Sequence, residues 1–208
     1  YPSVNPILFN ESNGLETVTG RIFPLAGIAN ITTTLGNENG YYPIIETDEH
    51  GFNNPKGLYE ENKVDIILTG DSFTEGYSVH SNESIGAVLR QLDFNTISVG
   101  KSGNGPLIEL ATLKEYAEPL KPKIVLWMYY INDLYELEDE MESSFLRKYL
   151  NDNNFSQNLI SRQDEIDSLL VDYVKDAQGK DPPLSLDSFR HHEKTWAAQE
   201  KDVQERSV

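Results

Sequence analysis

The chain has 208 residues, a formal net charge of −17 and no cysteine. The charge disfavours nucleic acids and anionic membrane surfaces as partners, because phosphate groups are bound by clustered Lys and Arg. The lack of cysteine excludes disulfides and thiolate metal sites. A content of 38% hydrophobic and 10% aromatic residues is enough for a packed core. No apolar run is long enough to cross a bilayer.

The first part of the chain is rich in Asn, Gly, Thr and Pro. Two short β segments, "ITTTL" at 31–35 and "YYPIIET" at 41–47, flank the turn-forming sequence "GNENG". The loop "DEHGFNNPKG" follows them. We therefore expect an irregular N-terminal lobe over residues 1–57, packed on a core domain that occupies residues 58–208.

From residue 63 onward, short apolar runs alternate with amphipathic helical patterns. The apolar runs predict strands at residues 64–69, 95–99 and 123–130. The amphipathic patterns predict helices at residues 83–92 and 106–120. Such βαβ alternation favours a parallel α/β sheet covered by helices on both faces, with right-handed crossovers.

The side-chain pattern also predicts which parts of these elements are buried. In the first helix, the apolar stripe is expected to face the core, and it consists of Ile85, Val88, Leu89 and Leu92. The acidic run from Glu136 to Glu142 is expected to be a solvated helical face without metal-ligand spacing. Residues 178–208 are expected to form a peripheral tail.

Each predicted strand is followed by residues that suit acyl transfer. The first strand leads into Gly70-Asp71-Ser72, the second into "GKSGNGP" at 100–106 and the third into "YINDL" at 130–134. Because sites in open parallel sheets form beyond the carboxyl ends of the strands, these segments are expected to meet. A serine hydroxyl can attack a carbonyl carbon, while backbone amides and a side-chain amide can stabilise the resulting oxyanion.

The sequence "GDSF", the glycine in the second strand-end loop and "ND" after the third strand together resemble the first three signature blocks of the SGNH/GDSL hydrolases. The resemblance covers residues 64–134. It implies a three-layer α/β/α fold with flavodoxin-like strand order, and an esterase or O-acyltransferase that needs no cofactor. It also implies that Ser72 is the nucleophile and that Gly103 and Asn132 form the oxyanion hole. The neighbouring residues expected to support the site are Asp71, Asn104 and Asp133.

The catalytic base of this family is a histidine three residues after an aspartate, and it follows further strands. None of the four histidines of the chain fits this pattern. His191 follows Asp187 by four residues and is the nearest alternative. We therefore expect that the sequence is a fragment that lacks the last strands and the base, and that it has little hydrolase activity by itself. The expected substrate is a small-molecule or saccharide acyl ester, such as a cell-envelope ester.

Several alternatives remain open at the level of sequence. Ser72 and Glu75 match the S-x-x-E capping box, so the serine can have a purely structural role. The domain can also be a catalytically inactive relative that serves in carbohydrate binding or assembly. A nucleotide- or flavin-binding module is disfavoured, because "GKSGNGP" lacks the Gly-x-Gly-x-x-Gly spacing. The start at Tyr1 is consistent with a removed signal or anchor and favours an extracytoplasmic location, while the oligomeric state is not predicted.

Overall fold

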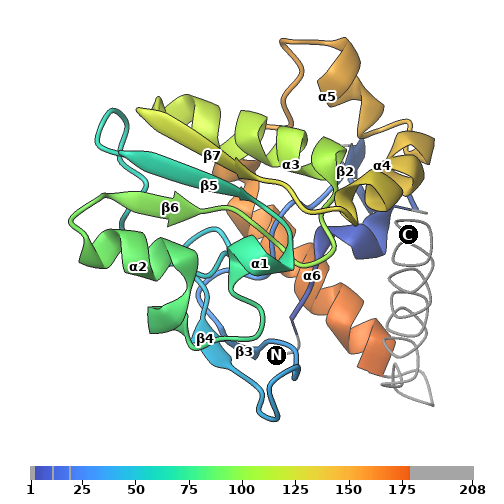
Figure 1. Ribbon diagram of the computed structural model, residues 1–208. Helices are drawn as coiled ribbons and strands as arrows, with labels where there is room; N and C mark the ends of the chain where they lie inside the picture. The colour runs from blue at the N-terminus through green and yellow to red at the C-terminus, as the bar shows by residue number, and fades with distance from the viewer. Residues whose placement is uncertain (1–2, 11, 19, 179–208) are drawn as a thin grey trace, which may run out of the picture. The chain divides into compact units, whose positions relative to one another are not determined.

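The computed structural model describes residues 3–10, 12–18 and 20–178. Residues up to Leu170 form one compact unit, and the described residues that follow complete the last helix. The chain is a mixed α/β protein with a three-stranded parallel sheet flanked by helices and two small antiparallel sheets near the N-terminus (Figure 1). The predicted division at residue 57 stays a prediction.

The parallel sheet has the strand order β6-β5-β7. Its strands are β5 (Ile66–Gly70), β6 (Thr96–Ser98) and β7 (Ile124–Met128). The predicted apolar runs therefore coincide with the observed strands, except that β5 extends one residue past the predicted end at 69, to Gly70. In the sheet, Leu68 of β5 pairs with Ser98 on one side and with Leu126 on the other. This order equals the first three positions of the flavodoxin-like order 2-1-3-4-5, and the complete order stays a prediction.

The crossover helices lie on opposite faces of the sheet. The segment between β5 and β6 contains α1 (Ser72–Glu75), the 3-10 turn Ser81–Glu83 and α2 (Ile85–Gln91). The segment between β6 and β7 contains α3 (Pro106–Thr112). This helix continues as a π turn (Leu113–Ala117) and a 3-10 turn (Glu118–Leu120). Gly86 of α2 packs on Leu68, whereas Glu109 of α3 accepts a hydrogen bond from Trp127. Leu126 and Trp127 are successive residues of β7, so their side chains point to opposite faces.

The N-terminal lobe consists of a 3-10 turn (Pro6–Phe9) and two hairpin-like sheets, formed by β1 (Leu15–Thr17) with β2 (Gly20–Ile22) and by β3 (Thr32–Thr34) with β4 (Ile44–Glu46). This lobe covers the outer edge of β6. The side chain of Asn54 donates to the carbonyl of Ser98 and accepts from its amide, both at 2.9 Å. The side-chain amide therefore replaces a neighbouring strand at this edge.

The remaining described helices are α4 (Asp133–Glu142), α5 (Arg147–Asn151), a 3-10 turn (Leu159–Arg162) and α6 (Gln163–Gln178). No helix in the described part of the chain is both long enough and apolar enough to cross a membrane. The core of the α/β unit is formed by buried apolar side chains of the sheet and of α3, among them Ile67, Leu68, Ile97, Val99, Ile108 and Ala111.

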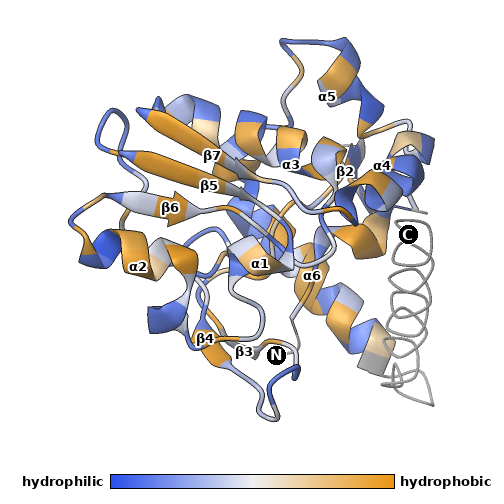
Figure 2. Cartoon of the chain, viewed as in Figure 1, coloured by the Kyte–Doolittle hydropathy of each residue, from blue (hydrophilic) through white to orange (hydrophobic). Residues whose placement is uncertain are grey.

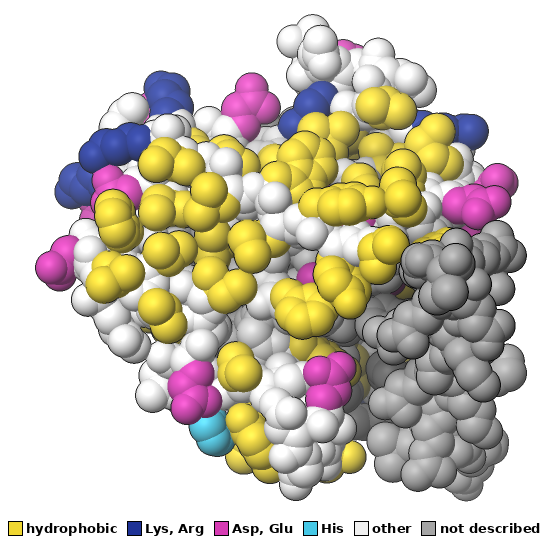
Figure 3. All heavy atoms as spheres, in the orientation of Figure 1, with side chains coloured by type: hydrophobic (Ala, Val, Ile, Leu, Met, Phe, Trp, Pro, Cys, Tyr) yellow, Lys and Arg dark blue, Asp and Glu magenta, His cyan; other side chains and the backbone are white. Residues whose placement is uncertain are grey.

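The edge of the sheet that β7 forms is open among the described residues. Burial differs from the prediction at this strand and also at α2. Strand β7 is hydrophobic along its length (Figure 2), yet Ile124 to Trp127 are between 38% and 49% exposed. The predicted core stripe of α2 is also exposed, at 37% for Ile85, 46% for Val88 and 62% for Leu92. The helix packs instead through Gly86 and Ala87, which are buried. Figure 3 shows the resulting hydrophobic side chains gathered on one face.

Candidate active site at the carboxyl ends of the strands

The nucleophile candidate Ser72 is the first residue of α1, directly after β5. The turn needs glycine at position 70, because its φ is +155° and a Cβ there would lie 2.2 Å from the Thr74 hydroxyl. Asp71 is the helix cap, and its Oδ1 accepts a hydrogen bond from the Phe73 amide at 3.0 Å. The predicted Ser72–Glu75 capping box is therefore wrong. Ser72 is partly exposed, and its hydroxyl makes no hydrogen bond to the residues described.

A buried ion pair links this turn to the second strand-end loop. The ammonium group of Lys101 lies 2.5 Å from Oε1 of Glu75, and the two side chains are only 3% and 0% exposed. The other carboxylate oxygen of Glu75 accepts from the Ser102 amide at 2.8 Å. Because Glu75 belongs to α1, the pair holds the loop that contains Gly103 against the helix that contains Ser72.

Gly103 lies in that loop with a φ of +78°, a conformation that favours glycine. It is partly exposed, and a side chain at this position would contact Ile7 of the N-terminal lobe. The next residue, Asn104, is completely buried. Both polar atoms of its side chain lack a hydrogen-bond partner among the described residues. The loop thus has an accessible backbone next to a buried, unsatisfied amide.

The third strand end meets the first through Asp71. The side chain of Asn132, at the start of α4, lies near enough to the Asp71 carboxylate to oppose the rise of its pKa, and it donates to Oε1 of Glu136 at 3.4 Å. Asp133 is buried, and its carboxylate accepts from the Tyr130 amide at 2.7 Å. Burial raises the pKa of Asp71, while the hydrogen bond from the Phe73 amide and the nearby Asn132 side chain oppose this shift. The structure therefore brings the Ser72 turn and Asn132 together.

Five carboxyl groups are close to one another at these strand ends, and we call them the acidic cluster: Asp71, Glu109, Asp133, Glu136 and Glu140. Burial raises the pKa of Glu109 and of Glu136 to about 8, that of Glu140 to about 7 and that of Asp133 to about 6. Neighbouring carboxylates of the cluster add to each of these shifts.

The acidic cluster corrects the prediction of a solvated acidic helix face. Glu140 is fully buried, and its two carboxylate oxygens accept from the backbone amides of Gly105 at 2.7 Å and Leu107 at 2.8 Å. It therefore fixes the start of α3. Glu109 accepts from the indole of Trp127 through one oxygen, while its other oxygen has no partner among the described residues. Within the described ranges, no group of His, Asp or Glu side chains is arranged to hold a metal ion.

The described histidines lie away from Ser72. Nδ1 of His50 is 3.3 Å from the Gln163 side chain, and its ring packs against Tyr59. His80 is exposed and stacks on Tyr41 with 4.8 Å between ring centroids. His191 lies outside the described residues. No histidine in the part of the chain that the structure describes contacts Ser72, so the catalytic base stays unassigned.

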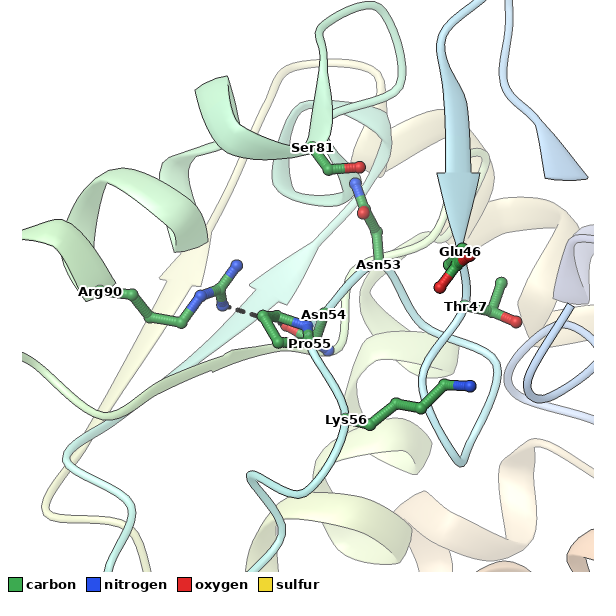
Figure 4. Close-up of a pocket in the computed structure, with 8 residues that line it drawn as sticks. All are labelled: Glu46, Thr47, Asn53, Asn54, Pro55, Lys56, Ser81 and Arg90. Atoms are coloured by element: carbon green, nitrogen blue, oxygen red, sulfur yellow. Dashed lines mark hydrogen bonds between the residues drawn. The ribbon is translucent and has the colours of Figure 1, made fainter. Parts of the chain in front are cut away.

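Cavities of measurable size lie elsewhere in the unit. A polar cavity of about 450 Å³ is lined by residues of the N-terminal lobe and of α2, among them Asn53, Lys56 and Arg90 (Figure 4). A second cavity, of about 350 Å³, lies between the end of α3 and Val125 of β7. Neither cavity includes Ser72 or Asn132. The strand ends are a better candidate for the reaction site than either cavity, because nucleophile and oxyanion candidates occur there together.

Comparison with known proteins gives little further information. No family model matches the sequence, and no curated protein matches it. Among solved structures, the chain is similar to a mutant of esterase AlinE4, with 20% sequence identity and a TM-score of 0.30. The match covers 70% of this chain and 98% of the esterase chain. A similarity this distant assigns neither a family nor an activity.

Proposed function

We propose that the protein is a serine-dependent acyl-ester hydrolase or O-acyltransferase of the SGNH type, acting on a small-molecule or saccharide ester. The observation that carries the proposal is the physical linkage of the three strand ends. The buried pair of Glu75 and Lys101 ties the Ser72 turn to the Gly103 loop. The side chain of Asn132 lies near the Asp71 carboxylate, so the third strand end reaches the same turn.

In the proposed reaction, the Ser72 hydroxyl attacks the ester carbonyl carbon while a base takes its proton. The backbone amides of Ser72 and Gly103 and the side-chain amide of Asn132 donate to the oxyanion. The bond from Asn132 to Glu136 is long at 3.4 Å, so an oxyanion can compete for this donor. Collapse of the intermediate expels the alcohol, which takes up a proton. Water or a sugar hydroxyl then releases the acyl group from Ser72.

The base is the part of this proposal that no contact supports. The resemblance to the SGNH hydrolases implies a histidine, and His191 is the candidate named by the sequence. Loss of a member of a catalytic triad costs several orders of magnitude in rate. A protein without this histidine would therefore retain the oxyanion donors and turn over ester very slowly.

A fluorophosphonate probe tests the proposal, because it labels activated serines covalently. We expect labelling of the full-length protein, and Ser72→Ala is expected to abolish this labelling. The matched control is Ser102→Ala, which removes a partly exposed hydroxyl from the neighbouring loop and is expected to leave labelling intact. Labelling that survives Ser72→Ala, or equal loss in both variants, would argue against Ser72 as the nucleophile.

A catalytically inactive SGNH-like domain for carbohydrate binding or assembly is the second candidate. It is favoured by one specific observation, the lack of a hydrogen-bond partner for the Ser72 hydroxyl among the described residues. This alternative expects no probe labelling and no ester turnover. It also expects saccharide binding that Ser72→Ala leaves unchanged, so the two candidates differ in both measurements.

A further inference from the structure

The polar cavity of about 450 Å³ lies along the outer edge of β6, separate from the strand-end site. Its walls come from β4, from the loop that follows β4, and from both ends of the segment that contains α2 (Figure 4). The lining includes Glu46, Asn53, Lys56, Ser81 and Arg90. The volume falls in the range of small-molecule sites, which is roughly 300–1,000 Å³.

Two basic side chains of this cavity lack a carboxylate partner. The chain has 17 Lys and Arg against 34 Asp and Glu, so a basic side chain is expected to find an acidic neighbour. Seven basic side chains of the described residues do form ion pairs. Lys56 and Arg90 form none with the described residues, nor do Lys114, Arg147 and Lys148, but Lys56 and Arg90 are the two that line the same cavity. A cavity with two unpaired cations in an acidic protein is suited to an anion.

The Arg90 guanidinium is fixed in place, which prepares it for a ligand. Its Nη1 donates to the Thr96 carbonyl at 2.9 Å and to Oδ1 of Asn54 at 3.3 Å, and Figure 4 shows the second of these bonds. In all of its hydrogen bonds to described residues, Nη1 is the donor atom. The N–H groups of Nε and Nη2 are therefore available in a fixed orientation. The buried acid whose charge acts on Arg90, Asp48, already accepts four hydrogen bonds.

The opposite side of the cavity offers hydrogen-bond acceptors. The amide nitrogen of Asn53 donates to the Glu75 carbonyl at 2.8 Å, so its oxygen is left to accept from a ligand. The side chains of Asn53 and Ser81 approach each other, and Glu46 lies across the cavity from Arg90 (Figure 4). A ligand that fits must therefore have an anionic group for Arg90 and hydroxyl groups for the acceptors on the other side, where the Lys56 ammonium also lies (Figure 4).

We propose that this cavity binds a carboxylate-bearing sugar, with a hexuronic acid as the simplest example. Its carboxylate would bind the Nε and Nη2 groups of Arg90, and its hydroxyls would donate to Asn53 and Glu46. The Lys56 ammonium lies on the Glu46 side of the cavity and would donate to an oxygen at the other end of the sugar (Figure 4). A neutral sugar would leave Arg90 unmatched, and inorganic phosphate has fewer hydroxyl groups than a uronate to donate to the acceptors. The proposal does not depend on catalysis by Ser72.

Isothermal titration calorimetry with glucuronate and galacturonate tests this proposal, with glucose, galactose and inorganic phosphate as comparison ligands. We expect saturable binding of a uronate that is at least about tenfold tighter than that of the matching neutral sugar, because a charge-assisted bond is lost. Lys56→Gln is expected to weaken uronate binding about tenfold. The control Lys63→Gln, which makes the same charge change at an exposed ion pair elsewhere, is expected to leave binding unchanged.

Several results would overturn the proposal. They are equal affinity for a uronate and its neutral sugar, phosphate binding as tight as uronate binding, and equal effects of the two lysine variants. Absence of saturable uronate binding at millimolar concentrations would do the same. Ser81→Ala provides a second variant at an exposed position, where loss of one hydroxyl is expected to weaken binding without affecting the fold. Unchanged uronate binding in both Ser81→Ala and Lys56→Gln would place any sugar site elsewhere.

Discussion

The acidic cluster predicts that the folded protein loses stability as the pH rises from about 5 to 8. Glu109 and Glu140 are fully buried, and burial raises their pKa values from 4.5 to about 8 and about 7. Between these values and 4.5, the folded state binds protons that the unfolded state has released. A raised carboxyl pKa therefore contributes stability that is present at low pH and is lost as the pH rises through the folded-state value.

The size of the effect follows from the number of protons retained. Each extra proton bound by the folded state lowers the free energy of unfolding by about 1.4 kcal/mol per pH unit. Near pH 6, Glu109 and Glu140 together retain nearly two protons if they titrate independently, which gives up to about 2.5 kcal/mol per pH unit. Total stabilities of domains are about 5–15 kcal/mol, so this loss is large enough to measure.

Urea unfolding followed by far-UV circular dichroism at pH 5, 6, 7 and 8 provides the assay. Glu109→Gln removes one titrating group, so its free energy of unfolding is expected to depend on pH less steeply, by about 1.4 kcal/mol per pH unit near pH 6. Its stability should approach or exceed that of the wild type at pH 8. The control Glu142→Gln changes an exposed carboxylate of α4 and should follow the wild-type curve. A wild-type stability that is constant or increases from pH 5 to 8 would refute the reasoning.

Two further predictions concern packing. Glu75→Gln leaves the Lys101 charge buried without its partner and is expected to lower the free energy of urea unfolding by about 3–5 kcal/mol. The double variant with Lys101→Met should recover much of this loss, and additive losses would contradict the pairing. The exposed face of β7 is expected to bind a hydrophobic dye, and Leu126→Lys should reduce dye fluorescence while changing the free energy of unfolding by less than about 1 kcal/mol. Its buried sheet neighbour is the comparison, because Leu68→Ala should cost about 2–5 kcal/mol.

The sequence is a good guide to where the strands lie, because strand formation follows from local apolar runs bounded by turns. Each of the runs at 64–69, 95–99 and 123–130 overlaps a strand of the parallel sheet, and only β5 extends beyond its run, by one residue. Burial is a different matter, since it depends on what covers a strand. Residues 124–127 are as apolar as a central strand, yet they are partly exposed because β7 is an edge strand and no further strand pairs with it among the described residues.

The error at α2 has a related cause. Periodicity correctly identifies an apolar stripe in this helix, but the stripe does not decide which face packs. The buried face consists of Gly86 and Ala87. These small residues lie against Leu68 and Ser98, and a Cβ at position 86 would be in van der Waals contact with both.

The candidate site was predictable only in its outline. Parallel topology brings strand ends together, and so the meeting of the Ser72 turn with Asn132 follows from the order of elements. The buried carboxyl groups do not follow from any local pattern. Glu109 and Glu140 look like ordinary polar positions of helices, and Glu140 is buried because it accepts two backbone amides at the start of a different helix.

Glu75 matches a local capping motif, yet its side chain forms a tertiary ion pair with Lys101. The S-x-x-E pattern predicts that this side chain returns to the start of its own helix. Asp71 already accepts from the Phe73 amide there, so Glu75 is available to pair with Lys101. A helix of only four residues has little stability of its own. The orientation of Ser72 relative to the Gly103 loop must therefore depend on the ion pair and on the surrounding packing. If Ser72 is the nucleophile, substitution of Glu75 would disturb catalysis without touching the substrate.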